Sequence, residues 1–282
     1  MQIGFSVNEM LFIATLVTGT LWVAWRMKLR GLNARGEHVT KKPLWVSFGA
    51  ELFVVVALMF TCRVALADWP KVPSGSMEPT LRVGDYLLVN HLAYGPRLPF
   101  TNTAIETGQP QRGDVVVFRY PPDVSQYYVK RLIGMPGDRV VFNDGTVIVT
   151  PLSQSTVSLT KAEVVNDNIG PDHPSEDRGQ WLVRESAAAV SAPERVLKIN
   201  PFVQGRLPLN LQDAGLAAHC QSPHAGAWEC SVPMGQYLML GDNRDNSADS
   251  RVWGFLPHEQ VYGKAVRVLF NWSDLKRAWT AL

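Results

Sequence analysis

The sequence has few of the residues that metal sites require. Cysteine occurs only three times among the 282 residues, at Cys62, Cys220 and Cys230, and none of the six histidines has the spacing of a ligand pair. The segment 258–262 reads His-Glu-Gln-Val-Tyr and lacks the second histidine of a zinc metalloprotease helix. We therefore expect no metal and no other cofactor.

Positive charge is too sparse for a protein that binds nucleic acid. The formal net charge is +2, and no basic stripe stands out beyond residues 26–42.

No positive charge precedes Arg26, and no small-x-small site follows the first apolar run. We therefore expect that run to be a retained anchor and not a cleaved signal peptide.

Two apolar runs predict transmembrane helices, at roughly 3–25 and 44–62. The loop 26–43 between them contains Glu37 and six basic residues: Arg26, Lys28, Arg30, Arg35, Lys41 and Lys42. Loops rich in positive charge stay in the cytoplasm, so both ends of the chain are expected outside it. Residues 1–66 are thus predicted to form a membrane anchor in contact with the lipid bilayer.

Glu51 falls inside the second predicted span. An ionisable residue in a span is a functional candidate by default. We favour instead a role in helix–helix packing or at the membrane interface, away from the chemistry.

Cys220 and Cys230 flank a short loop that contains Gly, Pro and Ser. In an oxidising compartment this pair predicts a disulfide, although two free thiols remain the alternative.

After residue 83 the chain alternates short β-type runs with turn signals. The expected strands are 85–94, 114–120, 127–133, 236–240 and 261–270, with a hairpin over 140–149 that turns at Asp144-Gly145. Residues 151–233 are rich in Ser, Asp, Asn and Pro, which is typical of an insertion with long loops. We predict a β core in two parts, 67–150 and 234–282, separated by this inserted region.

A serine in a tight loop follows the anchor. The segment 73–81 reads Pro-Ser-Gly-Ser-Met-Glu-Pro-Thr-Leu, and the second serine, Ser76, is expected to project from a fixed turn. Taken alone, the segment is equally consistent with a juxtamembrane linker. As a nucleophile, Ser76 would need a neighbouring base to take its proton.

Lys130 is the favoured base, because no histidine lies in a matching motif and the G-x-S-x-G turn of α/β-hydrolases is absent. It ends the apolar run Tyr127–Val129, where loss of hydration would lower the pKa of its amine. The alternative is a strand lysine that extends its amine to solvent.

The segment 241–251 reads Gly-Asp-Asn-Arg-Asp-Asn-Ser-Ala-Asp-Ser-Arg. Its two arginines and the absence of a terminal glutamate disfavour a calcium loop. A solvated polar loop remains possible, but the alternation of Ser, Asp and Arg favours a rigid support for a base.

Three segments together resemble the signature boxes of the bacterial type I signal peptidases (leader peptidases). They are 74–81, 130–140 and 237–250, the last extending here through Arg251. Two N-terminal membrane spans also match the usual form of this family. The resemblance does not cover residues 151–233, and Glu78 occupies a slot that the pattern leaves free. It implies a mostly antiparallel β catalytic domain with a smaller inserted β region.

The resemblance also implies a role for each matching residue. Ser76 would be the nucleophile and Lys130 the general base of a Ser/Lys dyad. The Ser74 hydroxyl and the Ser76 backbone N–H would bind the oxyanion. The others are Ser247, which would orient the lysine amine; Asp249 and Arg251, a supporting ion pair; Asp242 and Arg244, further scaffold; and Met77, Leu81, Tyr128 and Val129, which would line shallow apolar pockets.

The family's function is removal of N-terminal signal peptides from exported preproteins, after a small-x-small (Ala-x-Ala-like) site. For this chain the resemblance implies a serine endopeptidase of the bacterial inner membrane. Its catalytic domain would be periplasmic and close to the secretion translocon. The alternatives are a processing peptidase for one secreted or pilus-type substrate and a non-catalytic periplasmic binding module. An intact Ser76/Lys130 pair disfavours the second alternative.

Overall fold

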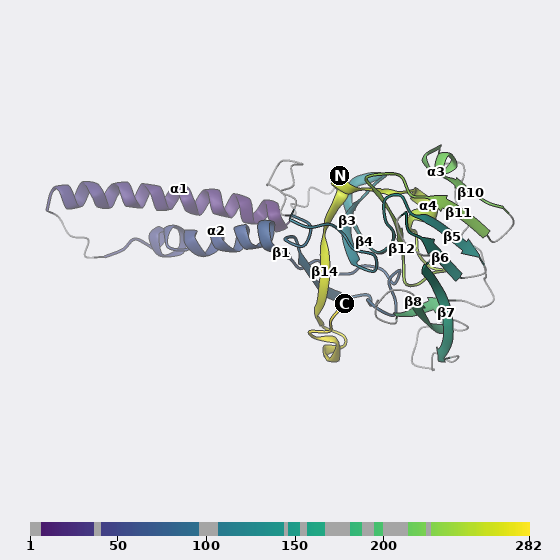
Figure 1. Ribbon diagram of the computed structural model, residues 1–282. Helices are drawn as coiled ribbons and strands as arrows, with labels where there is room; N and C mark the ends of the chain where they lie inside the picture. The colour runs from purple at the N-terminus through teal and green to yellow at the C-terminus, as the bar shows by residue number, and fades with distance from the viewer. Residues whose placement is uncertain are drawn as a thin grey trace. The chain divides into compact units, whose positions relative to one another are not determined.

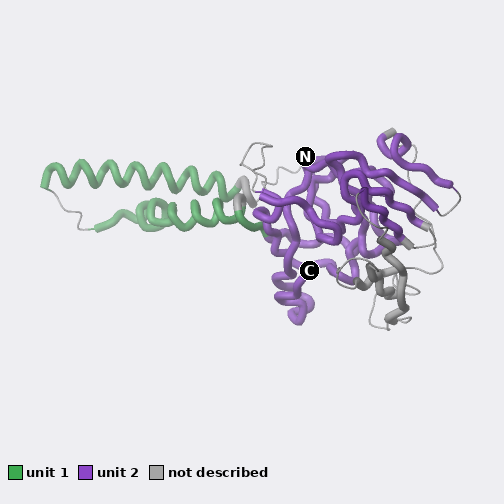
Figure 2. Tube along the Cα trace, viewed as in Figure 1, with its two compact units in different colours: residues 1–68, 96–105 green, residues 69–95, 106–282 purple. Residues whose placement is uncertain are grey.

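A computed structural model describes residues 7–36, 41–95, 107–143, 146–152, 157–166, 181–187, 195–199, 214–223 and 227–282. The chain divides into two compact units, which have different colours in Figure 2. The first unit is Met1–Asp68 with Pro96–Ile105, and the second is Trp69–Gly95 with Glu106–Leu282.

The first unit contains one long helix, α1 (Val7–Ala34), labelled in Figure 1. It ends nine residues beyond the predicted end at residue 25, so the first basic residues of the predicted loop lie on the helix. The sequence explains this extension, since Met, Leu, Lys and Arg after residue 25 are good helix formers. The part Met10–Ala34 is long and apolar enough to cross a membrane.

The second predicted span is less regular than the first. It comprises η1 (Val46–Ala50), α2 (Phe53–Thr61) and η2 (Cys62–Leu66), where η1 and η2 are π-helical and interrupt the α-helical run. The apolar helix Val46–Thr61 is shorter than a span usually requires. Within the described residues, α1 alone has the length and composition of a membrane span, so the prediction of two spans is not confirmed.

The two helical segments of this unit contact each other. Trp25 of α1 is buried together with Val46 and Ala50 of η1. Glu51 forms an ion pair with Lys42, with 2.5 Å between Lys42 Nζ and Glu51 Oε1. Because the partner is a residue of the predicted basic loop, this contact favours an interfacial role for Glu51. The short strand β1 (Ala67–Asp68) ends the unit.

The second unit contains two antiparallel sheets, and the first of them carries the serine loop, residues 73–81. Within this unit, the order of its strands is β2-β14-β3-β4-β12-β13. Their bounds are β2 (Asp85–Asn90), β3 (Val115–Tyr120), β4 (Asp123–Gly134), β12 (Gln236–Leu240), β13 (Leu256–Pro257) and β14 (Val261–Asn271). The predicted strands of the β core are thus present, with ends shifted by a few residues.

The second sheet has the strand order β10-β11-β5-β6-β7-β8-β9. Its strands are β5 (Arg139–Asn143), β6 (Thr146–Thr150), β7 (Val157–Asn166), β8 (Trp181–Ala187), β9 (Arg195–Ile199), β10 (Cys220–Gln221) and β11 (Ala227–Ser231), and α3 (Ala214–His219) precedes β10. The hairpin expected over 140–149 is formed by β5 and β6, while its turn at 144–145 lies outside the described residues. Because β5 and β6 pair with strands of the inserted region, the second sheet begins at residue 139 and not after residue 150.

The predicted disulfide is confirmed. Cys220 and Cys230 lie opposite each other on β10 and β11, and their sulfurs are bonded. The bond closes a loop with a sequence separation of 10 residues. Loop closure of this size stabilises a fold by about 2–3 kcal/mol.

Side chains from both sheets share a buried core. Ile133 and Leu238 of the first sheet are buried with Val140 and Cys230 of the second. The remaining helices are short: α4 (Ser250–Trp253), η5 (His258–Gln260) and η6 (Leu275–Arg277). The fold therefore presents the serine loop, β4 and the segment after β12 on one rigid β scaffold.

Candidate active site

Ser76 is held in a tight turn between the anchor and β2. Within the serine loop, Glu78 N donates to Gly75 O at 3.0 Å. From the segment after β12, Asn243 N donates to Ser76 O and Asn243 Nδ2 donates to Gly75 O, both at 3.1 Å. Backbone contacts on both sides of Ser76 therefore fix the position of its buried side chain.

Lys130 lies on β4 opposite Val116 of β3, and its amine reaches the serine. The distance from Lys130 Nζ to Ser76 Oγ is 2.6 Å, and both side chains are buried. The ring of Tyr128 lies 5.6 Å from the amine nitrogen. The two residues predicted to form a reacting pair are thus in direct contact.

Burial lowers the pKa of Lys130 to about 8, from an ordinary value of 10.5. The negative charges of Asp249 and Asp242 act in the opposite direction, while Arg251 lowers it further. Loss of hydration is the largest cause, because an ammonium ion is less stable away from water. A neutral amine can accept a proton from a hydroxyl, which an ammonium cannot.

The polar loop, residues 241–251 after β12, contains the predicted ion pair. Arg251 Nη2 lies 2.7 Å from Asp249 Oδ2, and both side chains are buried. Asp249 Oδ2 also accepts from Gly241 N at 3.0 Å, and Arg251 Nη2 donates to Arg244 O at 2.6 Å. Arg244 Nε donates to Gly241 O at 3.1 Å. These contacts tie the two ends of the polar loop together.

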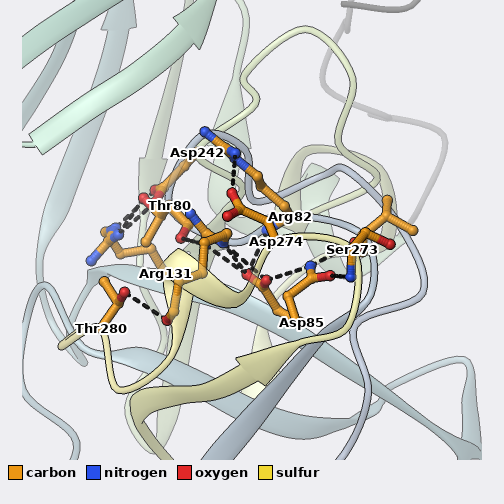
Figure 3. Close-up of polar contacts among 11 residues, drawn as sticks. Thr80, Arg82, Asp85, Arg131, Asp242, Ser273, Asp274 and Thr280 are labelled. Carbon is orange, nitrogen blue, oxygen red and sulfur yellow. Dashed lines mark hydrogen bonds and ion pairs between the residues drawn. The ribbon is translucent and has the colours of Figure 1, made fainter.

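Asp242 connects the polar loop with two other segments, as Figure 3 shows. It accepts from Arg131 Nε at 2.8 Å and from Thr80 Oγ1 at 2.6 Å. Burial opposes the ionisation of Asp242, but the charge and hydrogen bonds of Arg131 hold its pKa below the usual range. Thr80 lies in the serine loop, and Arg131 follows Lys130 on β4. The three matching segments therefore meet at one buried carboxylate.

Arg131 and Thr80 were assigned no role from the sequence, although both lie in the matching segments. Their partner Asp242 is 111 residues from Arg131 and 162 from Thr80. The sequence does contain one signal for this contact, an arginine at position 131 within an apolar strand. A buried arginine requires a carboxylate partner.

Ser247 does not make the contact that was expected of it. Its Oγ is buried, and within the described part of the chain no group forms a hydrogen bond with it. Ser247 packs against Gly241, where an added Cβ would collide with the Ser247 side chain and with Ser76 O. The expected hydrogen bond to Lys130 is absent from this arrangement, in which the amine donates to Ser76 Oγ.

A cavity of about 450 Å³ opens beside the reacting pair. Ser74, Ser76 and Lys130 line it together with Tyr128 and Val129, the last two of which were predicted to line the substrate pockets. Opposite the serine loop, the wall is formed by β4, which over residues 123–130 has a single strand partner, β3, among the described strands.

Met77 and Leu81 do not line this cavity, which corrects their assignment to the substrate pockets. Both are fully buried in a cluster with Leu87, Val89 and Val268. The cause is the tight turn after Ser76, which is closed by a hydrogen bond from Leu81 N to Met77 O at 2.9 Å. This turn directs both side chains into the core, where their packing holds the serine loop in place.

Two of the histidines contact tyrosines. His258 Nδ1 lies 2.8 Å from the Tyr237 hydroxyl, and His91 Nδ1 lies 3.1 Å from Tyr262 O. His173 and His224 lie outside the described residues. In the described part of the chain, no three His, Cys, Asp or Glu side chains gather as metal ligands would.

Comparison with known proteins relates most of the chain to one family. The model of the family "Signal peptidase, peptidase S26" matches residues 45–270. Signal peptidase I of Pseudomonas fluorescens is 35% identical over 259 residues, covering 85% of this chain and 78% of the relative. Signal peptidase I of Haemophilus influenzae is 31% identical over 339 residues, covering 98% of this chain and 88% of the relative.

A solved structure of a signal peptidase I from Enterococcus faecalis is also similar in sequence. It is 27% identical and covers 55% of this chain and 96% of that chain. Its TM-score of 0.30 is too low to support a statement about the fold.

The buried Lys130 predicts that stability depends on pH. Its pKa is about 8 when folded and ~10.4 when unfolded, so the unfolded chain binds more protons between these values. Stability should therefore rise across this window. Near neutral pH, Lys130→Met should remove the cost of burying the positive charge and should stabilise the protein by about 3 kcal/mol. Above the unfolded-state pKa the lysine is neutral in both states, so this difference in stability should disappear.

The measurement is the free energy of unfolding of both proteins in denaturant, repeated across this pH range. Lys276→Met, at an exposed lysine, is the control and should show no such dependence. A stability difference for Lys130→Met that is constant with pH would contradict the lowered pKa.

Proposed function

Because this chain belongs to the signal peptidase family, peptidase S26, we propose that it cleaves signal peptides with a Ser76/Lys130 dyad. Membership makes the chain an enzyme, a serine peptidase whose relatives are named signal peptidase I. The observation that carries the dyad is the 2.6 Å contact between Lys130 Nζ and Ser76 Oγ in a buried site. The same contact disfavours a non-catalytic binding module, because such a module needs no base beside its serine.

In the proposed reaction, neutral Lys130 accepts the hydroxyl proton as Ser76 Oγ attacks the carbonyl carbon of the scissile peptide bond. Lys130 then donates this proton to the leaving amine as the carbon–nitrogen bond breaks, and the signal peptide remains bound as an ester of Ser76. Water next attacks the ester, with Lys130 again as base. Breakdown restores the Ser76 hydroxyl and the neutral amine.

The negative oxygen that develops on the carbonyl needs donors in the cavity. Ser74 is exposed on the cavity wall, two residues before the nucleophile. We assign its hydroxyl and the Ser76 backbone N–H to this oxygen. Donors that are in place before the reaction stabilise the transition state without further reorganisation.

The substrate is expected to bind as an extended strand along β4. The free backbone groups of β4 beside the cavity can pair with a peptide, as sheet edges commonly do. Tyr128 and Val129 lie on this edge, and the ring of Tyr128 stacks on Tyr120 with 4.2 Å between centroids. The stacked ring leaves a shallow apolar surface, which supports cleavage after a small-x-small sequence.

The membrane anchor would hold this site at the outer surface of the bilayer. α1 has the length and composition of a span, and we propose that the segment 44–62 crosses as well, with the basic loop in the cytoplasm. Ser76 then lies close to the bilayer on the periplasmic side, near the translocon. Anchoring enzyme and signal peptide in one membrane raises their effective concentration.

The dyad is tested by cleavage of a preprotein in detergent. Activity of the wild type should rise with pH through about 8, the pKa of Lys130, and then level off. Ser76→Ala and Lys130→Arg should each lower kcat by roughly 10⁴-fold or more while remaining folded, since removal of either member disables the pair. His219→Gln and His258→Gln are the matched controls and should keep full activity. Near-normal kcat in Lys130→Arg would exclude lysine as the base.

The oxyanion assignment predicts a different signature for Ser74. Ser74→Ala should lower kcat by roughly 10²–10³ with little change in KM, because the lost hydrogen bond is made mainly in the transition state. A raised KM with kcat intact would instead make Ser74 a substrate-binding residue.

The proposed topology is tested with reporter fusions. A reporter placed after Lys42 should be cytoplasmic, and one placed after Leu282 should be periplasmic, because the basic residues 26–42 stay inside. A cytoplasmic signal from the second fusion would exclude the proposed compartment and with it the substrate.

A further inference from the structure

The C-terminal tail, residues 272–282, folds back onto β14. Val268 N donates to Thr280 O at 2.8 Å, and Leu282 N donates to Val266 O at 3.1 Å. The turn that reverses the chain contains η6, which ends at Arg277. The tail is therefore held by backbone hydrogen bonds, and Arg277 has a defined place on it.

Arg277 reaches from this tail to the serine loop and to the start of β2. Its Nη2 donates to Thr80 O at 2.9 Å and lies 2.7 Å from Asp85 Oδ2, and its Nε donates to Asp85 Oδ1 at 3.0 Å. Asp85 is fully buried, and it also accepts from Asn271 Nδ2 at 2.8 Å. Burial opposes the ionisation of Asp85, but the hydrogen bonds of Arg277, the Arg82 backbone and Asn271 hold its pKa below the usual range.

Thr80 is the point at which this contact meets the active site. Its carbonyl oxygen is held by Arg277, and its hydroxyl donates to Asp242 at 2.6 Å. Asp242 in turn binds Arg131, the residue after Lys130. Figure 3 shows Thr80 between Asp85 on one side and Asp242 with Arg131 on the other. Arg277 is thus connected to the strand that carries the base by three successive contacts, through Thr80 and Asp242.

We propose that Arg277 is a positioning residue, which holds the serine loop so that Ser76 meets Lys130. The proposal rests on the proposed function of these two residues. Without the guanidinium, Asp85 would be left buried with only neutral hydrogen-bond donors, and Thr80 O would lose its partner. The serine loop would then keep its contacts with the polar loop, Arg131 and the core, but would lose its link to the C-terminal tail.

A shift of the serine loop would change the chemistry more than substrate binding. A displacement of about 1 Å between reacting groups can cost roughly 100-fold in rate. Arg277 contacts Asp85 and Thr80 and does not contact the β4 wall of the cavity, where the substrate is proposed to bind. KM should therefore change little. A loosened loop would also let water reach Lys130, whose pKa would rise towards its ordinary value.

The groups that act on the Lys130 amine lie on three elements, of which the serine loop contributes the Ser76 hydroxyl. Asp242, Asp249 and Arg251 belong to the polar loop, and the Tyr128 ring belongs to β4. None of them is changed in an Arg277 variant. A shift in the pH dependence of kcat would therefore indicate that the serine loop packs less closely against Lys130.

The test compares Arg277→Gln with Arg82→Gln in the full-length protein, using preprotein cleavage in detergent. Arg82 is the matched control, because it lies in the same region and pairs at 3.2 Å with Asp274 of the same tail, but on the surface. We expect Arg277→Gln to lower kcat by about 10–100-fold, to leave KM within about twofold and to move the pH profile to higher pH. Arg82→Gln should match the wild type in all three respects.

Arg277→Lys keeps a positive charge opposite Asp85 but lacks the planar fork that binds Asp85 and Thr80 together. It should fold, as judged by its thermal midpoint, and show a kcat between those of the wild type and Arg277→Gln. If Arg277→Gln does not fold, this variant decides the question. Wild-type kcat and pH profile in a folded Arg277 variant would overturn the proposal.

The two proposals fail in different ways. Activity retained in Ser76→Ala would overturn the dyad and with it the role of Arg277. Loss of activity in Ser76→Ala together with normal chemistry in the Arg277 variants would overturn the positioning role alone.

Discussion

The burial of the Lys130 amine is the constraint on which the site depends. Asp242 and Asp249 lie near this amine, and each is already bound by an arginine, Arg131 and Arg251. In the described part of the chain, no ion pair joins Lys130 to a carboxylate. Each buried acid is thus neutralised by a group that stays protonated, and the lysine is left without a counter-ion. This arrangement favours a neutral amine without removing negative charge from the protein.

The strand order explains why segments far apart in the sequence meet here. β4 lies between β3 and β12 in the first sheet, so the polar loop that follows β12 emerges beside Lys130. The serine loop precedes β2 and is fixed from the opposite side by β14 and its tail. The described strands of the inserted region extend the second sheet. A large insertion is tolerated in this chain because it pairs with β5 and β6, away from the reacting groups.

Local patterns in the sequence were sufficient to single out the serine and the lysine that lie in contact. Ser76 could be predicted because a Pro- and Gly-rich turn has few alternatives, and Lys130 because an apolar strand penalises its charge. The β5–β6 hairpin and the disulfide were likewise predicted from short-range signals. Contacts between distant segments were not predictable in this way. Arg277 and Asp85 are 192 residues apart, and nothing near either residue indicates its partner.

Other errors arose where tertiary packing decided the outcome. Met77 and Leu81 are apolar residues next to the nucleophile, and the sequence does not say whether they face a pocket or the core. The tight turn after Ser76 places them in the core. The charged residues after Trp25 predict a loop too early, because lysine and arginine are also compatible with a helix and α1 continues through them to Ala34.

The position of β14 also limits when this protein can become active during its synthesis. β14 (Val261–Asn271) pairs with β2 on one side and with β3 on the other, so the first sheet has a gap in its middle until residue 271 has been made. Ribosomes add roughly 5–20 residues per second, so many seconds separate the synthesis of Ser76 from that of β14. A chain still on the ribosome therefore carries its serine and its lysine but lacks the sheet that holds them. A peptidase built in this order therefore lacks a complete active-site scaffold until its own translation is nearly finished.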